Sequence, residues 1–235
     1  GLEDIELELA ARQDDGSWIV RPRTSEETFT VLDRVGRVPL PPYIRDGQMV
    51  DADVENYQTV FAKTQGSVAA PTAGLHFTDS LLAKIQGRGV SIEEVTLHVG
   101  IGTFRPIQTD RIDDHVMHVE WGSISEQTAN QIRARRSGGS RCIAVGTTSV
   151  RVLESACAAH SGELAAWTGQ TDLFIRPPHT FQAVDALMTN FHLPRSSLLV
   201  LVSAFAGREL TLQAYQVAIE QEYRFYSYGD AMLIL

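Results

Sequence analysis

Hydrophobic and polar residues alternate in two short stretches near the start of the chain. Over residues 3–9, isoleucine and leucine alternate with glutamate, which is the period-two pattern of a half-buried strand. An Asp-Asp-Gly turn follows, and residues 17–21 form a second run of strand-forming residues. The pattern therefore predicts a β-hairpin. A short helix, capped by Thr24 or Ser25 and ending at Val35, is expected after it.

From residue 78 onward, segments with helical periodicity alternate with runs rich in β-branched and apolar residues. This alternation is typical of an α/β fold, and we expect a mixed sheet with helices on both faces. The preceding residues 39–76 lack periodicity, and aperiodic connections of this length are often functional. The predicted helices cover residues 78–86, 125–136, 147–159, 196–206 and 209–222, and the predicted strands cover residues 90–99, 117–124, 141–145, 172–175, 181–188 and 223–228.

The composition is that of an ordinary globular protein. The chain has 235 residues, 43% hydrophobic and 21% charged, and no apolar run approaches the roughly 20 residues of a membrane-spanning helix. The acidic start differs from a signal peptide, so we expect a cytoplasmic protein. Two cysteines, Cys142 and Cys157, are too few for a disulfide framework or a cysteine-rich zinc site. Because the chain begins without Met and enters a strand pattern at once, we expect it to be part of a longer protein.

Charge is distributed unevenly. The net charge is −9, and residues 1–55 hold 13 acidic residues against 6 arginines. Residues 131–151 hold five arginines and no acidic residue, which is the pattern of either a solvated helix face or an anion-binding patch. The net acidity therefore does not exclude a nucleic-acid partner. The five arginines are Arg133, Arg135, Arg136, Arg141 and Arg151.

The clearest local motif is Gly146-Thr147-Thr148-Ser149, between a predicted strand and a predicted helix. The start of a helix directs free backbone N–H groups at one point and favours an anion, and hydroxyl groups supply further donors. Arg151 follows closely and would add positive charge. Ordinary N-capping is the alternative, although three successive hydroxyl residues exceed what one cap requires.

A second glycine-rich motif, Gly100-Ile101-Gly102, also follows a predicted strand. The next residues, Thr103-Phe104-Arg105-Pro106, do not open a helix, and no third glycine is in register. The dinucleotide-binding fingerprint is therefore not met. The remaining interpretation is a tight turn at which the backbone approaches a ligand, with Arg105 beside it.

The sequence His115-x-x-His118-x-Glu120 is similar to part of a metal site. In a strand, His118 and Glu120 share one face and His115 points away, whereas in a helix the two histidines share a face. Because no second cluster completes a coordination shell, we expect no metal and assign these residues structural or substrate-facing roles.

Two further segments hold polar residues where α/β sites usually lie. Residues 189–194, which include Asn190 and His192, connect a predicted strand to a helix and form either a site or a capped turn. In the strand predicted over residues 223–228, Arg224, Tyr226 and Tyr228 share one face, where they stack on a base or pack in a core.

Eight segments, taken in order along the chain, match the pattern of one protein family. They are residues 39–44 (PLPPYI), 57–63 (YQTVFAK), 66–77 (GSVAAPTAGLHF), 97–106 (LHVGIGTFRP), 115–120 (HVMHVE), 144–151 (AVGTTSVR), 185–205 and 223–234. Together they resemble the S-adenosylmethionine:tRNA ribosyltransferase-isomerases of queuosine synthesis. Each motif alone is weakly specific, but the ordered set covers nearly the whole chain from Val35.

The resemblance implies an enzyme that transfers the ribosyl part of S-adenosylmethionine to 7-aminomethyl-7-deazaguanine at the wobble position of a tRNA. The sugar is isomerised, giving epoxyqueuosine with release of adenine and methionine. S-adenosylmethionine is then a substrate, tRNA is the partner, and no metal and no membrane are involved; we expect a monomer. The family fold is an α/β domain with an inserted β-barrel, which makes residues 1–35 a remnant of the barrel and 36–235 the catalytic domain. Family members also carry an N-terminal region absent from this sequence.

The chemistry implied by this resemblance needs groups that titrate near neutrality. Deprotonation beside the sulfonium and protonation of the departing adenine suit histidine, so His98 and His192 are the first candidates and His76 and His118 the second. Residues 146–149 would hold the methionine carboxylate or a tRNA phosphate, and the arginines the tRNA backbone. The expected substrate-binding residues are Gly100, Gly102, Thr103, Arg105, Thr147, Thr148, Ser149, Arg151, Asn190, Tyr226 and Tyr228.

Two other functions remain open from the sequence. One is a non-catalytic tRNA-binding fragment, which would bind tRNA without S-adenosylmethionine. The other is a different S-adenosylmethionine-dependent RNA-modifying enzyme, of which a conventional methyltransferase would need the glycine fingerprint that this chain lacks.

Overall fold

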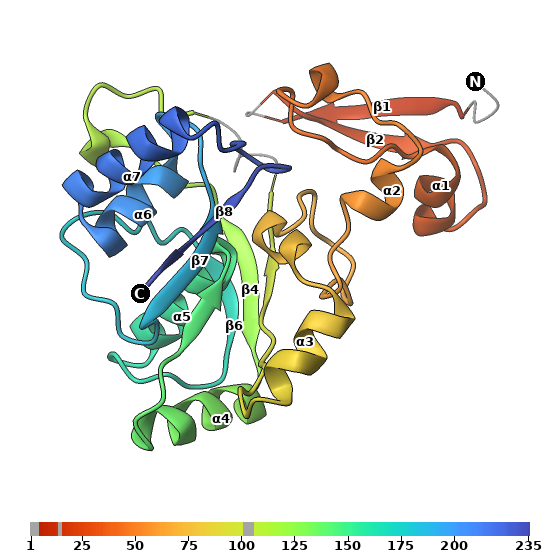
Figure 1. The fold of residues 1–235 in the computed structure, drawn as a ribbon. Helices are drawn as coiled ribbons and strands as arrows, with labels where there is room; N and C mark the ends of the chain where they lie inside the picture. The colour runs from red at the N-terminus through yellow and green to blue at the C-terminus, as the bar shows by residue number, and fades with distance from the viewer. Residues whose placement is uncertain (1–4, 14–15, 101–105) are drawn as a thin grey trace. The chain divides into compact units, whose positions relative to one another are not determined.

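The computed structural model describes residues 5–13, 16–100 and 106–235. The chain divides into two compact units, Gly1–Met49 and Val50–Leu235, which are called the first and the second unit below. Figure 1 shows the hairpin of the first unit and the sheets and helices of the second.

The first unit is a β-hairpin followed by one α-helix. Strands β1 (Leu7–Arg12) and β2 (Trp18–Pro22) pair antiparallel, which confirms the predicted hairpin, and most of their side chains are exposed. Helix α1 (Thr28–Val35) ends at the expected residue, but Glu27 is its N-cap rather than Thr24 or Ser25. The Thr24 hydroxyl instead accepts a hydrogen bond from the backbone of Glu26 in the preceding turn. A 3₁₀ turn, η1 (Arg45–Gly47), follows, and the assignment of residues 1–35 to a β-barrel stays a prediction.

The described part of the second unit contains both helices and strands that alternate along much of the chain, as expected for an α/β protein. Its helices and 3₁₀ turns are α2 (Asp53–Asn56), η2 (Thr72–His76), α3 (Asp79–Gln86), η4 (Ile112–Asp114), α4 (Glu126–Ser137), α5 (Thr147–Ala159), α6 (Ser197–Ala206) and α7 (Arg208–Glu220). Its strands are β3 (Thr96–His98), β4 (Glu120–Ile124), β5 (Ile143–Val145), β6 (Trp167–Thr171), β7 (Ala186–Asn190) and β8 (Ala231–Ile234).

Local capping residues set the starts of three helices. The side chains of Thr78, Ser125 and Ser196 accept hydrogen bonds from backbone N–H groups three residues ahead, at the beginnings of α3, α4 and α6. These helices therefore begin within one residue of their predicted positions.

The strands of the second unit form two three-stranded sheets. One has the order β3-β4-β6 and is antiparallel, while the other has the order β5-β7-β8. In the latter sheet β5 and β7 are parallel and β8 is antiparallel to β7. The mixed α/β class is thus confirmed, and the strands that the structure describes are divided among three sheets when the hairpin is included.

Helix α5 is the centre of the second unit. It packs against strands of both three-stranded sheets, and Figure 1 shows it behind β7. Val150, Val152 and Ala156 on α5 and Leu187 on β7 are fully buried in the main hydrophobic core. The buried residues of α5 also include the charged Arg151 and Glu154. Because the helix is surrounded by protein, these side chains need partners inside the protein.

Two predicted strands are wrong. Residues 172–175 form no strand, and the strand instead precedes them as β6, whose Trp-Thr-Gly-Gln-Thr sequence lacks an apolar run. Residues 223–228 form a turn, in which Tyr226 has a φ of 74° and the backbone N–H of Asp230 bonds to the carbonyl of Arg224. Strands β3 and β4 are also shorter than predicted and begin at Thr96 and Glu120.

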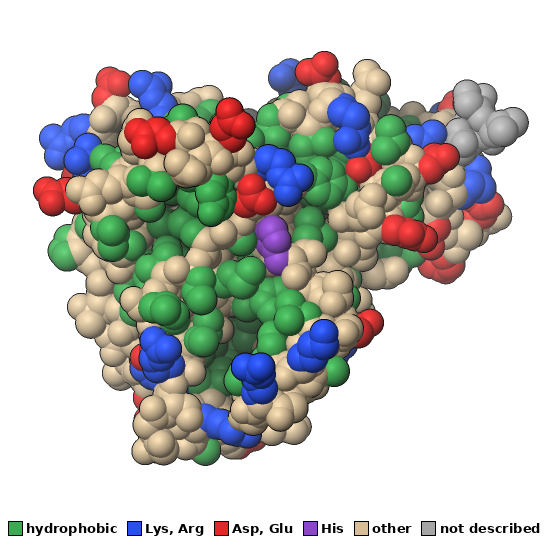
Figure 2. All heavy atoms as spheres, viewed as in Figure 1, with side chains coloured by type: hydrophobic (Ala, Val, Ile, Leu, Met, Phe, Trp, Pro, Cys, Tyr) green, Lys and Arg blue, Asp and Glu red, His purple; other side chains and the backbone are tan. Residues whose placement is uncertain are grey.

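Figure 2 shows hydrophobic side chains gathered over the part of the second unit where β5, β7 and β8 lie in Figure 1. Ile143 on β5 and Leu233 on β8 are both about half exposed. Within the described residues, no helix is long and apolar enough to cross a membrane.

Candidate functional site

The carboxyl ends of the parallel strands β5 and β7 lie side by side. Val145 pairs with Met188, and the Gly146 N–H donates to the Met188 carbonyl at 2.8 Å. Gly146 has a φ of 87°, a backbone conformation that only glycine adopts readily, and the chain enters α5 directly after it. In open α/β sheets, ligands bind outside the carboxyl ends of the strands. This position is therefore the first place to look for a site.

The start of α5 has the properties that the Gly-Thr-Thr-Ser motif predicts, with one exception. No described side chain caps this helix, so its first backbone N–H groups keep their capacity to bind an anion. Thr147 is buried and Thr148 is partly buried. The exception is Ser149, whose hydroxyl donates to the Val145 carbonyl at 2.8 Å and serves the local fold.

A polar network from two distant segments adjoins this helix start. Asn190, the last residue of β7, is 2% exposed. Its Oδ1 accepts from the Thr72 hydroxyl at 3.0 Å, and its Nδ2 lies 3.3 Å from His76 Nε2. Thr72 and His76 are the two ends of η2, so one buried amide positions the whole turn.

Turn η2 also lies against the beginning of α5. A Cβ atom added to Gly146 would lie 3.7 Å from Cβ of Ala73 and 3.0 Å from the Thr148 hydroxyl oxygen. The helix start, Asn190 and the exposed His76 therefore form one cluster, which we call the carboxyl-end site.

His192 lies beside this site but is held differently. Its Nε2 is 2.9 Å from the Thr189 hydroxyl, and its backbone N–H donates to the Tyr215 hydroxyl oxygen at 2.7 Å. Burial lowers the pKa of His192 to about 4 and raises that of Tyr215 to about 12. The neutral form of the imidazole is therefore favoured near pH 7.

The other two candidate histidines have different neighbours. The His98 ring on β3 stacks on the Trp121 ring at a centroid distance of 5.0 Å, and Gly66 leaves room for it. His118 is exposed and precedes β4. His115 contacts Phe174, and burial together with the charge of His118 lowers its pKa. Among the residues that the structure describes, no three His, Cys, Asp or Glu side chains gather as metal ligands.

Arg151 lies inside the protein rather than at the surface expected of a tRNA contact. It is 4% exposed and pairs with the equally buried Glu120, and it donates to the Thr171 carbonyl at 3.3 Å. The second Glu120 oxygen accepts from the Gly100 N–H at 3.2 Å. Glu120 was singled out in the sequence only as part of a metal-like motif, because nothing local connects it to Arg151. Gly102, Thr103 and Arg105 lie outside the described residues.

Most of the arginine-rich segment is neutralised by distant acidic residues. Arg133 pairs with Glu163 at 2.6 Å, and Arg136 pairs with Asp185 at 2.8 Å. Arg135 and Arg141 are exposed and form no ion pair within the described ranges. An open depression of about 510 Å³ lies at this end of α4. It is lined by Arg136, Ser137, Gly139, Ser140, Arg141 and Asp185.

Tyr226 and Tyr228 lie in the turn before β8, not on a strand face. The Tyr226 N–H donates to the Phe191 carbonyl at 2.9 Å, and the Tyr228 hydroxyl donates to Asp53 Oδ1 at 2.9 Å. The same turn touches the carboxyl-end site, because Asn190 Nδ2 lies 3.5 Å from the Gly229 carbonyl. The strand face on which the two tyrosines were expected is therefore absent, and their role in substrate binding stays a prediction.

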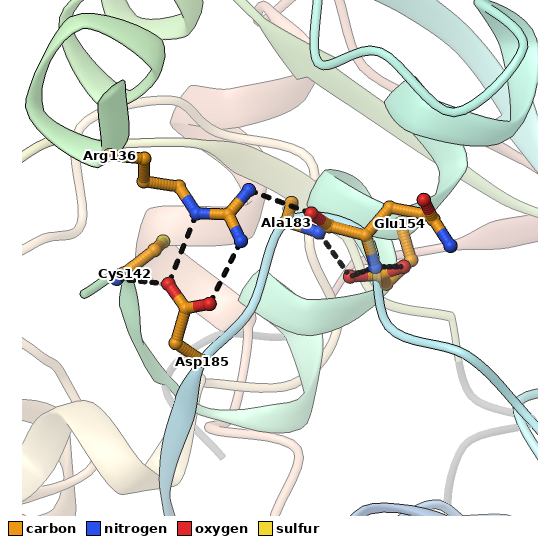
Figure 3. A network of polar contacts seen from close by, with 6 residues as sticks. Arg136, Cys142, Glu154, Ala183 and Asp185 are labelled. Atoms are coloured by element: carbon orange, nitrogen blue, oxygen red, sulfur yellow. Dashed lines mark hydrogen bonds and ion pairs between the residues drawn. The ribbon is translucent and has the colours of Figure 1, made fainter. Parts of the chain in front are cut away.

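A second polar network lies at the amino ends of β5 and β7 (Figure 3). Asp185 accepts two hydrogen bonds from the Arg136 guanidinium and one from the Cys142 N–H at 2.7 Å. Although burial opposes ionisation, these donors lower the pKa of Asp185. Glu154 on α5 accepts from the backbone N–H groups of residues 182 and 183. Burial raises the pKa of both free cysteines, Cys142 and Cys157, to about 11, so these thiols stay protonated near pH 7.

Comparison with known proteins gives a consistent assignment. The profile of a family described as "Queuosine biosynthesis protein" matches residues 2–234. The S-adenosylmethionine:tRNA ribosyltransferase-isomerase of Heliobacterium modesticaldum is 52% identical over 98% of this chain, and that of Erythrobacter litoralis is 51% identical over 99%. This chain covers 67% of the length of each.

A solved structure agrees. The crystal structure of S-adenosylmethionine tRNA ribosyltransferase from Thermotoga maritima superimposes with a TM-score of 0.58 at 36% identity. It matches 99% of this chain, and this chain covers 63% of it. The chain therefore belongs to the queuosine biosynthesis family of S-adenosylmethionine:tRNA ribosyltransferase-isomerases.

Proposed function

We propose that this chain transfers and isomerises the ribosyl moiety of S-adenosylmethionine onto 7-aminomethyl-7-deazaguanine in the wobble position of a tRNA. The products are epoxyqueuosine-tRNA, adenine and methionine. The observation that supports this most directly is the carboxyl-end site, where an uncapped helix start, a buried amide and an exposed histidine converge. The proposal includes a monomeric cytoplasmic protein that uses no metal.

The start of α5 suits the carboxylate of the methionine part of S-adenosylmethionine. Backbone N–H groups and the helix dipole favour an anion at this point, and the Thr148 hydroxyl is an additional donor. Glycine is favoured at position 146 because φ is 87° there, and an added Cβ would lie 3.0 Å from the Thr148 hydroxyl oxygen.

His76 is the best-placed candidate for proton transfer. It is exposed at the end of η2, and Asn190 holds its Nε2, which orients the ring. The sulfonium of S-adenosylmethionine acidifies the adjacent ribose C5′–H. Because an amide nitrogen only donates, Nε2 is the unprotonated nitrogen of the neutral His76 ring, and it would exchange the Asn190 hydrogen bond for this proton before giving a proton to the departing adenine. His192, neutral and hydrogen-bonded to Thr189, supports the wall of the site rather than exchanging protons.

The tRNA backbone would contact Arg135 and Arg141, the exposed arginines of this segment for which the described residues show no ion pair. Arg141 lines the open depression that follows α4, and Arg135 lies in the last turn of that helix. Their contribution is electrostatic, so affinity for tRNA should fall steeply as salt increases. The ion-paired Arg133, Arg136 and Arg151 should contribute less.

Adenine release from S-adenosylmethionine tests this function. The reaction is followed by chromatography with tRNA that carries 7-aminomethyl-7-deazaguanine and with the same tRNA lacking this base. Release that depends on the modified base is the expected result. Methyl transfer to the RNA would instead indicate a methyltransferase, and tRNA binding without calorimetrically detectable S-adenosylmethionine binding would indicate a binding module. Either result would contradict the proposal.

A further inference from the structure

One buried carboxylate connects the end of β3 to helix α5. Glu120 Oε1 accepts from the Gly100 N–H at 3.2 Å, and Glu120 Oε2 pairs with the Arg151 guanidinium. Glu120 and Arg151 are each 4% exposed. Each oxygen of the carboxylate therefore serves a different segment of the chain, and the two segments are far apart in sequence.

Stability alone is a weak reason for such a pair. Removing two charges from water costs about as much as their attraction returns, and apolar residues of similar shape often stabilise a protein equally well. An apolar residue at position 120 would, however, leave the partly buried Gly100 N–H without an acceptor. The specific contribution of Glu120 is thus to hold the backbone at Gly100.

The neighbouring contacts at this point are also directed at the backbone. The Val99 N–H donates to the Ser67 hydroxyl oxygen at 3.0 Å, and the Val68 N–H donates to the Val99 carbonyl at 2.9 Å. The chain therefore leaves β3 along a path held on one side by residues 67–68 and on the other by Glu120. Among the hydrogen bonds of the described residues, those of the Glu120 carboxylate connect this path to α5 through Arg151.

We propose that Glu120 is a positioning residue for the transfer reaction, acting through its hydrogen bond to the Gly100 N–H to fix the backbone at the end of β3, a strand that packs against α5. It does not touch the substrate itself. This inference rests on the proposed function, because α5 is where S-adenosylmethionine is placed.

Two matched double variants separate positioning from stability. Glu120→Gln with Arg151→Met keeps an oxygen acceptor for the Gly100 N–H, whereas Glu120→Leu with Arg151→Met removes it. Both variants lack the buried charges, and both deprive the Thr171 carbonyl of its Arg151 donor. Thermal unfolding of both proteins checks that their stabilities match. If the Leu-Met protein does not fold, Glu120→Met with Arg151→Met replaces it.

Two readouts are compared in the full chain: hydrogen exchange of the Gly100 amide by NMR, and the dissociation constant for S-adenosylmethionine by calorimetry. We expect the Gln-Met protein to keep slow exchange and an affinity within about threefold of the original. The acceptor-free protein should exchange faster at Gly100 and bind about tenfold more weakly.

Equal exchange and equal affinity in the two variants would overturn the proposal, because a purely structural ion pair does not depend on the acceptor for Gly100. If the unaltered chain binds no S-adenosylmethionine, the proposed function fails. The exchange rate then still decides whether Glu120 holds Gly100, so the two failures are distinguishable.

Discussion

The parallel strands β5 and β7 have a polar network at each end, and the two networks differ in what they leave unsatisfied. At the amino ends, Asp185 and Glu154 accept hydrogen bonds from a guanidinium and from backbone N–H groups, all within the protein (Figure 3). At the carboxyl ends, no side chain of the described residues caps the first N–H groups of α5, and His76 is exposed.

The difference indicates that the two ends of these strands have different roles, one in stability and the other in ligand binding. A network whose donors and acceptors are satisfied within the protein stabilises the fold, because breaking one of its hydrogen bonds leaves a polar group inside the protein without a partner. A network that keeps free donors beside an exposed imidazole is arranged for a ligand. Substitutions at the amino ends should therefore change stability, and substitutions at the carboxyl ends should change binding and catalysis.

The largest expected effect is on stability, from Glu154→Ala at the amino ends. Glu154 is 3% exposed, and its removal leaves the backbone N–H groups of residues 182 and 183 unpaired. We expect the free energy of unfolding, measured in urea, to fall by about 4 kcal/mol. The control Glu163→Ala, at an exposed ion pair, should cost less than about 1 kcal/mol. A similar loss in both variants would contradict the distinction.

The next effect is a pH dependence of stability at His192. Its pKa is about 4 in the folded protein because burial disfavours the charged ring, against 6.5 for an unperturbed histidine. Between these values the unfolded chain binds more protons, so stability is present above pH 6.5 and is lost as the pH falls toward 4. The glutamine side chain in the His192→Gln variant does not titrate, so this variant lacks the pH-dependent contribution.

Urea unfolding at several pH values measures this contribution. The difference in unfolding free energy between the original protein and His192→Gln should change by about 3 kcal/mol from pH 7 to pH 4. If the unfolding free energies of the two proteins changed with pH in parallel, His192 would be solvated and available for acid–base chemistry, and it would join His76 as a candidate in the carboxyl-end site.

At the carboxyl ends, His76→Ala should reduce catalysis without unfolding the protein. Loss of a general acid–base group lowers the rate by about 100-fold or more, measured as adenine release with modified tRNA. Because His76 is exposed and the buried Asn190 amide keeps its contacts with Thr72 and Gly229, the free energy of unfolding of the variant should change by less than about 1 kcal/mol. His160→Ala, an exposed histidine at the other end of α5, is the control. Equal rates in the two variants would remove His76 from the mechanism.

The smallest expected effect is on binding, from Thr148→Val at the start of α5. Loss of one hydroxyl donor should weaken S-adenosylmethionine binding about fivefold by calorimetry, with little change in unfolding temperature. Thr180→Val, the same change in the loop before residue 182, should leave the affinity unaltered. An affinity equal to that of the original chain would show that the ligand lies elsewhere.

The sequence predicted those features that neighbouring residues control. The hairpin, the helices that begin after Thr78, Ser125 and Ser196, and the glycine-led start of α5 all depend on contacts within a few residues. Local patterns were misleading where tertiary contacts prevailed. The tyrosine-rich segment 223–228 has strand-like composition, yet it turns because its backbone bonds to Phe191 and within itself.

The candidate site was only partly predictable for the same reason. The histidines and the hydroxyl motif are visible in the sequence, but nothing in it distinguishes His76, held by Asn190, from His192, neutralised by burial. The arginine-rich segment also has a strong local charge that the fold largely cancels.

By itself, the sequence determined the fold class and the family, because periodicity and ordered motifs are properties of the chain, and it offered a set of candidate residues for the chemistry. The tertiary structure decided which of those residues are paired, buried or exposed. Glu120 meets Arg151, Asp185 meets Arg136, and Thr72 meets Asn190 across 31, 49 and 118 residues of sequence. Charge compensation and burial depend on distance in space, and only the folded chain sets those distances.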